Sequence, residues 1–182
     1  MKKLFLIGGL MTAFLLVVVA ATAQTKPNFA GGWNLDKAKS QGLSTRMQGA
    51  DKVTWTVTQD DKTISIDQKV EGGQPPAGGG GGMGGGRGMG MGGPQSYNLD
   101  GSETTADIGG GQMTGKATSK ATWSGGSLEL SRKSTFQGPN GEVTTSNTQK
   151  LSLSGDGKTL TAVVHSESPR GTTDSTLVFD KQ

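Results

Sequence analysis

The stretch ATWSGGSLEL, Ala121–Leu130, decides the fold of this chain. Apolar and polar residues alternate on both sides of Gly125-Gly126, which is typical of two β-strands joined by a tight turn. A turn at these glycines sets Trp123 opposite Leu128, so the apolar residues of both strands share one face. A slip of one residue would move them to the other face, and the register is therefore specified.

The same test extends the hairpin to the C-terminus. Three further turns each bring apolar residues of neighbouring strands onto the same face. They are centred on Pro139-Asn140, Asp156-Gly157 and Ser168 to Gly171, and they pair Phe136 with Val143, Leu153 with Leu160 and Ala162 with Leu177. The C-terminal part is therefore predicted to be one antiparallel meander of five strands.

The N-terminal part also shows strand patterns. Residues 52–59 and 62–70 alternate apolar residues with Thr and Ser, and a two-residue turn at Asp60-Asp61 predicts Val57 opposite Ile64 and Trp55 opposite Ile66. Shorter strands are expected at 32–36, 95–99 and 103–108. Helical periodicity is weak, and only residues 36–43 are expected to form one or two helical turns.

These strands predict an all-β fold, a soluble antiparallel meander of eight to ten strands that closes into a barrel. Closure of the first strand against the last is expected because open sheet edges invite aggregation. The outward positions hold Thr, Ser, Lys, Glu and Arg, which could not face lipid, so a transmembrane barrel is excluded.

The first 23 residues are predicted to be a signal peptide. Lys2 and Lys3 precede an apolar run, and Ala21-Thr22-Ala23 has the small-x-small pattern of a cleavage site. An uncleaved membrane anchor is the alternative. After cleavage no membrane span is expected, and residues 24–71 and 95–182 form a single barrel domain.

Between these two parts lies a segment that cannot contribute to a core. Fourteen of the 22 residues from 72 to 93 are glycine, and residues 72–94 are predicted to be a flexible, disordered loop inserted between two strands. Met83, Met89 and Met91 could offer thioether ligands to copper. Without a nearby His or Cys they form a weak set of ligands, and no metal site is predicted.

Charge and cysteine content exclude several classes of protein. Removing residues 1–23 takes away two of the 18 Lys and Arg residues, which leaves 16 against 15 acidic residues, a net charge near +1. Nucleic-acid binding therefore lacks its electrostatic basis. The chain has no cysteine, which excludes a disulfide framework and a lipid-modified lipoprotein. A periplasmic or extracellular protein is expected.

The first strand carries a Gly-x-Trp pattern in Gly31 and Trp33 that resembles lipocalins and their calycin relatives. Several further segments, among them TWTVTQDDKTISI, YNLDGSE and LSLSGDGKTLT, are similar to small secreted bacterial proteins described as lipocalin-like. The resemblance spans nearly the whole mature chain. It implies a barrel that binds a small apolar or amphipathic ligand, without a cofactor, whereas the disulfides and C-terminal helix of larger lipocalins are missing.

The predicted inward face is apolar at one end and polar at the other. An inward Arg needs an anionic or hydrogen-bonding partner, so Arg132 could hold a ligand carboxylate. The alternative is that Arg132 reaches water at an open rim. The candidate ligand-binding residues are Trp33, Trp55, Arg132, Asn147, Gln149, Ser166 and Ser175.

No catalytic constellation is visible, and the chain is not expected to be an enzyme. The single histidine, His165, falls on the outward face, and the serines lack an activating partner. The three tryptophans are interpreted as core residues and end plugs rather than saccharide platforms. Two functions therefore stay open: a ligand-binding barrel, and a non-catalytic structural or protein-interaction module of the cell envelope with a packed interior.

Overall fold

The computed structural model describes residues 26–72, 93–110, 113–138 and 141–182, which contain ten strands and one short helix. The first four strands are β1 (Gly31–Leu35), β2 (Lys52–Gln59), β3 (Thr63–Glu71) and β4 (Gln95–Asn98), with helix α1 (Thr45–Gly49) between β1 and β2. The others are β5 (Thr104–Gly110), β6 (Met113–Ser124), β7 (Ser127–Gly138), β8 (Gly141–Leu153), β9 (Thr159–Ser168) and β10 (Gly171–Lys181).

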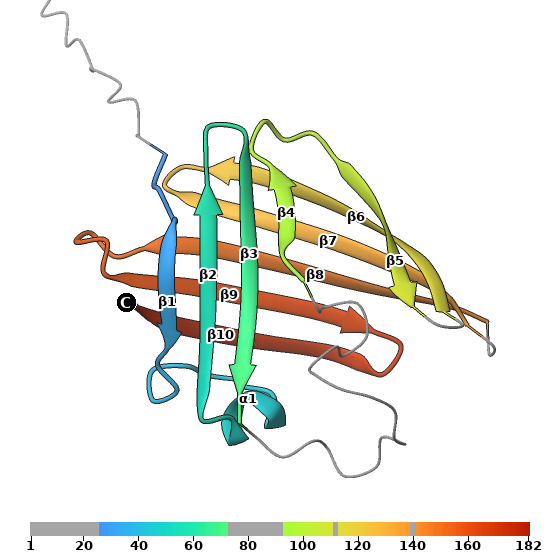
Figure 1. Cartoon of the computed structure of the whole chain (residues 1–182), viewed down its shortest axis with the longest axis horizontal. Coiled ribbons are helices and arrows are strands. Elements are labelled where there is room, and N and C mark those ends of the chain that lie inside the picture. The colour runs from blue at the N-terminus through green and yellow to red at the C-terminus, as the bar shows by residue number, and fades with distance from the viewer. Residues whose placement is uncertain (1–25, 73–92, 111–112, 139–140) are drawn as a thin grey trace, which may run out of the picture.

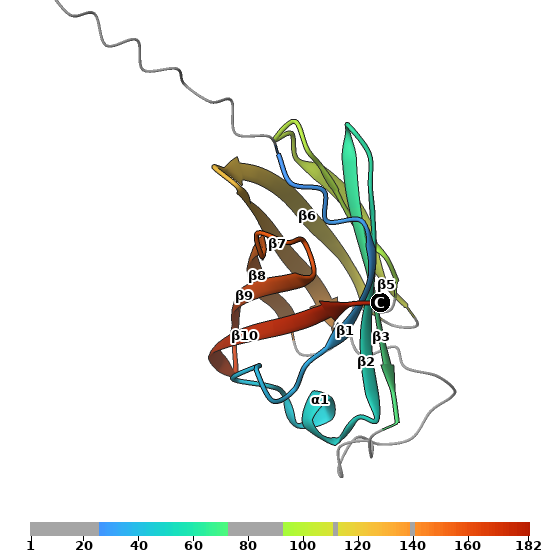
Figure 2. The same cartoon turned by 90° about the vertical axis from the view of Figure 1, so that its left-hand side faces the viewer.

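All ten strands belong to one antiparallel sheet with the order β4-β3-β2-β1-β10-β9-β8-β7-β6-β5. The sheet curls into a nearly closed barrel with two walls. Strands β1–β4 form one wall and cross the longer strands β6–β10 of the other wall (Figures 1 and 2). The predicted all-β meander is confirmed.

The two walls are joined where the first strand meets the last. Strand β1 pairs with β10, with Trp33 opposite Lys181 and Leu35 opposite Phe179, and on its other side with β2. The predicted pairing of the first strand with the last is therefore confirmed.

The predicted registers of the C-terminal meander are also confirmed. The observed pairs include Trp123 with Leu128, Phe136 with Val143, Leu153 with Leu160 and Ala162 with Leu177. A left-handed glycine completes the first of these turns, since Gly125 has a φ of 59°.

The hairpin between β2 and β3 corrects one prediction. The expected two-residue turn at Asp60-Asp61 does not form, because the Asp60 carboxylate accepts hydrogen bonds from the backbone N–H groups of Lys62 and Thr63, each over 2.7 Å. This Asx-type turn holds a longer loop, and Asp60 N–H donates to the Thr63 carbonyl over 3.0 Å.

The longer loop shifts the register by two residues. Trp55 lies opposite Gln68 instead of Ile66, and Val57 lies opposite Ile66 instead of Ile64. A shift of two keeps every side chain on its predicted face, so the apolar pattern alone could not detect the error.

The predicted helical turns at 36–43 are misplaced, because the helix covers Thr45–Gly49. The Asp36 carboxylate accepts the N–H groups of Ala38 and Lys39 and forms a turn at this position. The helix begins after Ser44, whose hydroxyl accepts the N–H of Met47 over 3.3 Å.

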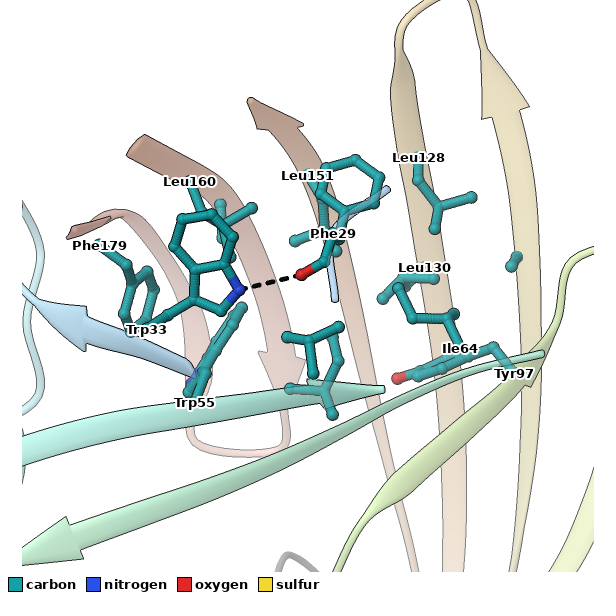
Figure 3. Close-up of a cluster of buried hydrophobic side chains, with 14 of the residues drawn as sticks. Phe29, Trp33, Trp55, Ile64, Tyr97, Leu128, Leu130, Leu151, Leu160 and Phe179 are labelled. Atoms are coloured by element: carbon teal, nitrogen blue, oxygen red, sulfur yellow. Dashed lines mark hydrogen bonds between the residues drawn. The ribbon is translucent and has the colours of Figure 1, made fainter. Parts of the chain in front are cut away.

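One half of the barrel interior is filled by large apolar side chains. The Trp33 indole is fully buried and donates to the Phe29 carbonyl over 2.9 Å (Figure 3). The Trp55 and Phe179 rings pack with their centroids 4.4 Å apart. We call this cluster the apolar half: Phe29, Trp33, Trp55, Val57, Ile64, Leu128, Leu130, Leu151, Leu160 and Phe179, each at most 2% exposed.

Within the residues described, no helix is long and apolar enough to cross a membrane. The predicted signal peptide at 1–23 lies outside the described residues. So does most of the glycine-rich loop predicted at 72–94, including Met83, Met89 and Met91.

Candidate functional site

Polar side chains occupy the inward face next to the apolar half. On β8 and β9 they form a chain of hydrogen bonds: Gln149 Nε2 donates to Asn147 Oδ1 over 2.9 Å, and Asn147 Nδ2 donates to Ser166 Oγ over 2.8 Å. All three residues are half-buried. We call this part of the interior the polar half; it consists of Arg132, Asn147, Gln149 and Ser166 and the residues that face them.

Arg132 brings a positive charge into the polar half. On β7 it lies opposite Asn147 on one side and Ser119 on the other, and its side chain is half-buried. No hydrogen bond or ion pair joins Arg132 to another side chain in the part of the chain that the structure describes. Its charge is therefore available to a partner.

The phenol of Tyr97 on β4 lies within electrostatic range of Arg132. Burial raises the pKa of Tyr97 to about 12, and the Arg132 charge opposes this shift. The neutral hydroxyl donates to Gln95 Oε1 over 3.0 Å. Both walls of the barrel thus contribute polar groups to the same region.

Three glutamines converge on a small cavity between the walls. The cavity has a volume of about 40 Å³ and is lined by Trp55, Ile66, Gln68, Gly93, Gln95 and Gln149. We call it the glutamine cavity. Hydrogen bonds hold all three amides: Gln68 Oε1 accepts the Trp55 indole N–H over 2.9 Å, Gln95 accepts Tyr97, and Gln149 donates to Asn147.

One polar atom at the glutamine cavity lacks a partner. Gln149 Oε1 is buried, and no described residue donates a hydrogen bond to it. Buried carbonyl oxygens are normally satisfied, so Gln149 holds an unsatisfied acceptor beside this cavity.

The seven predicted site residues do not all lie together. Arg132, Asn147, Gln149 and Ser166 gather in the polar half, and Trp55 lies beside Gln149 at the glutamine cavity. Ser175 shares the inward face but lies beneath Gly42, where an added Cβ would come within 3.1 Å of its side chain. Trp33 lies within the apolar half and lines neither cavity described in this section.

Sequence reasoning missed Gln68, Gln95 and Tyr97. The two-residue register error placed Ile66 opposite Trp55 and so hid Gln68, although the alternation Ile64, Ile66, Gln68 already puts all three on one face. Gln95 and Tyr97 alternate in the same way on β4, and their position opposite β3 depends on the 73–92 connection, which carries no pairing signal.

A second cavity, of about 270 Å³, lies at the loop end of β2 and β6. Its lining includes Lys26, Asp60, Asp61 and Trp123. The Trp123 ring stacks on Phe29, with centroids 6.2 Å apart, and the Lys26 ammonium lies 5.3 Å from its centre. Phe29 and Lys26 of the protein itself therefore already cover the Trp123 ring, which is not free to stack on a ligand.

His165 lies on the outer surface, as predicted. Its Nδ1 is 2.6 Å from Asp174 Oδ1 and its Nε2 is 3.4 Å from Glu167 Oε1, and these hydrogen bonds raise the pKa of the imidazole. Across the described ranges, no group of three or more His, Cys, Asp or Glu side chains could hold a metal ion.

No family model matches the chain, and no curated protein matches it. Among solved structures, the chain is similar to the ileal bile acid-binding protein of zebrafish in complex with cholic acid. The TM-score is 0.45 and the identity 16%, over 85% of this chain and 98% of that chain. At these values the likeness carries no argument about function, and the fold assignment rests on the strand order itself.

Proposed function

We propose that this protein binds a small amphipathic anion in the polar half of its barrel, with the anionic group at Arg132. The observation that carries the proposal is the inward, half-buried residue Arg132, whose guanidinium has no carboxylate partner among the described residues. A partly desolvated cation is stabilised by an anion that accepts charge-assisted hydrogen bonds. A guanidinium also suits a carboxylate or phosphate because it can donate two parallel bonds.

Inward apolar residues on β8 and β9 support an amphipathic ligand over a purely ionic one. Val143, opposite Phe136, points to the inward face and is 40% exposed, and Val164, opposite Gln149, is half-buried. An apolar part of the ligand would cover these side chains and remove apolar surface from water.

The apolar half is not the place for a ligand chain. Its side chains are at most 2% exposed, and the adjoining glutamine cavity, at about 40 Å³, has no room for an alkyl chain. This packing favours the second candidate function, a structural or protein-interaction module without a ligand, and the experiment must distinguish the two.

The proposed place of action is the periplasm or the outside of the cell. The support is the signal-peptide pattern at 1–23.

Native mass spectrometry of the protein purified gently from its source tests the proposal, followed by extraction and identification of any bound molecule. We expect a stoichiometric adduct that bears an acidic group. Arg132→Gln should lose the adduct, and Lys133→Gln, on the outer face of the same strand, should retain it.

Arg132→Lys separates the role of the charge from that of the paired hydrogen bonds, because it keeps the positive charge and loses the two parallel donors of the guanidinium. Partial retention of the adduct is expected. A clean apo mass that fatty acids and other amphipathic anions do not shift would contradict the proposal and favour the structural module.

A further inference from the structure

We propose that the glutamine cavity receives a hydroxyl group of the ligand, so that the preferred ligand is a hydroxylated amphipathic anion. This inference rests on the proposed function and specifies the chemical class of its ligand. It is carried by the three amides that line a cavity of about 40 Å³ and by the unpartnered oxygen of Gln149.

The size and walls of the cavity define the group that fits. About 40 Å³ has room for a hydroxyl or a few water molecules, but not for a carbon chain or a phosphate with its counter-charges. Trp55 and Ile66 provide apolar walls, and the amides of Gln68, Gln95 and Gln149 provide the polar ones. The lining carries no charged side chain, so a neutral polar group is favoured over an ion.

The hydrogen bonds around the cavity hold the amides in place. Gln68 is fixed by the Trp55 indole and Gln95 by the Tyr97 hydroxyl, so both present their remaining donors without rearrangement. Gln149 is fixed through Asn147 and Ser166. A preorganised set of polar groups discriminates strongly, because a ligand that lacks the matching group leaves them unpaired.

A hydroxyl can also pair with Gln149 whichever way the donors and acceptors run along the hydrogen bonds that join Gln149, Asn147 and Ser166. In the observed direction Gln149 Oε1 is the free acceptor; it is buried, so a rotation of the side chain must turn it toward a donor on the ligand. Because the Ser166 hydroxyl can donate as well as accept, both amides could reverse, and Gln149 would then present its NH₂ group. A hydroxyl both donates and accepts, whereas a carbonyl or an ammonium fits only one of the two directions.

The position of the cavity relative to Arg132 constrains where the hydroxyl lies on the ligand. Gln149 is two residues along β8 from Asn147, the residue opposite Arg132. Such diagonal neighbours are separated by about 7–8 Å between Cα atoms. The acid group and the hydroxyl would thus be held by different residues, so we expect a hydroxyl several bonds from the acid group to bind better than one on the carbon next to it.

Titration calorimetry with matched probes tests the inference: dodecanoate, and monohydroxydodecanoates whose hydroxyl moves along the chain. We expect the wild-type protein to bind one mid-chain isomer about tenfold more tightly than dodecanoate, the change that one net hydrogen bond gives. The isomer hydroxylated next to the acid group should gain nothing.

Gln149→Met should abolish the preference for the hydroxylated probe over dodecanoate, because Met keeps the length and removes the polar group. Lys150→Met, on the outer face of β8, is the matched control and should keep the preference.

The outcomes separate the two proposals. Equal binding of dodecanoate and every hydroxylated isomer to the wild-type protein would overturn the inference and leave the anion site standing. Failure of every probe to bind would overturn the proposed function and the inference with it. The wild-type comparison needs no variant, so a misfolded Gln149→Met could not obscure the result.

Discussion

The two halves of the barrel interior are built from the same strands and differ in how completely they are filled. The apolar half is closed by side chains at most 2% exposed, whereas the polar half keeps Arg132, Asn147 and Gln149 half-buried. Along β8 the change takes two residues, from Leu151 to Gln149. The comparison places the packed core and the proposed binding site on different segments of one strand, so substitutions in the two halves should have different consequences.

The largest effect is expected from Trp33→Ala in the apolar half. The substitution removes a fully buried indole and its hydrogen bond to the Phe29 carbonyl, and we expect a loss of about 3–5 kcal/mol in the free energy of unfolding. Urea denaturation followed by circular dichroism measures it. Thr56→Ala, on the exposed face of β2, is the control and should change stability by less than about 0.5 kcal/mol. A loss below about 1 kcal/mol for Trp33→Ala would show that the Trp33 indole is not needed for the stability of the apolar half.

Gln149→Met in the polar half should change the free energy of unfolding by no more than about 1 kcal/mol in either direction. It removes a buried unpartnered oxygen, which is favourable, and one hydrogen bond to Asn147, which is unfavourable. The same denaturation experiment measures the change. A loss above about 3 kcal/mol would mean that the polar half supports the fold, and the distinction between the halves would fail.

The smallest effect is expected on the outer surface, at His165. Hydrogen bonds to Asp174 and Glu167 raise the pKa of the His165 imidazole in the folded protein above its ordinary value of 6.5, so protonation favours folding. The contribution of His165 to the free energy of unfolding is complete at pH values below the pKa of the imidazole in the unfolded chain. It is lost as the pH rises through the higher pKa of the folded protein. NMR titration should show a pKa above 6.5 that falls in Asp174→Asn. An unchanged pKa in that variant would contradict the assigned cause.

Much of the fold could be predicted because the turns of four of the five tested hairpins have a centre that follows from the apolar pattern. Trp123 with Leu128 and Leu153 with Leu160 pair as the pattern requires. The fifth hairpin failed because the Asp60 carboxylate captures two backbone N–H groups, an interaction that adds residues to the loop without disturbing the alternation. Hydrophobic periodicity reports the face of a strand, and side-chain capping of a loop determines its register.

Apart from Trp55, the candidate site was predicted on one wall only. Alternation on β7, β8 and β9 placed Arg132, Asn147, Gln149 and Ser166 together, and the hydrogen bonds among the last three agree with that register. The opposite wall could not be predicted, because its approach depends on how the two walls cross in space. Local sequence contains no signal for Gln68 and Gln149 meeting at one cavity.

The pairing of β1 with β10 has a consequence for the order of folding. Trp33 and Lys181 are neighbours in the sheet but stand near opposite ends of the described chain, whereas most other pairs join adjacent hairpin strands. Contacts of such long sequence separation carry the largest loop-closure cost and form slowly. Before they form, β1–β4 and β5–β10 are two separate meanders, each with an uncovered apolar face. Strand β10, with eleven residues, therefore joins the two meanders into the barrel. We expect the nascent chain to stay prone to aggregation until this strand has been synthesised.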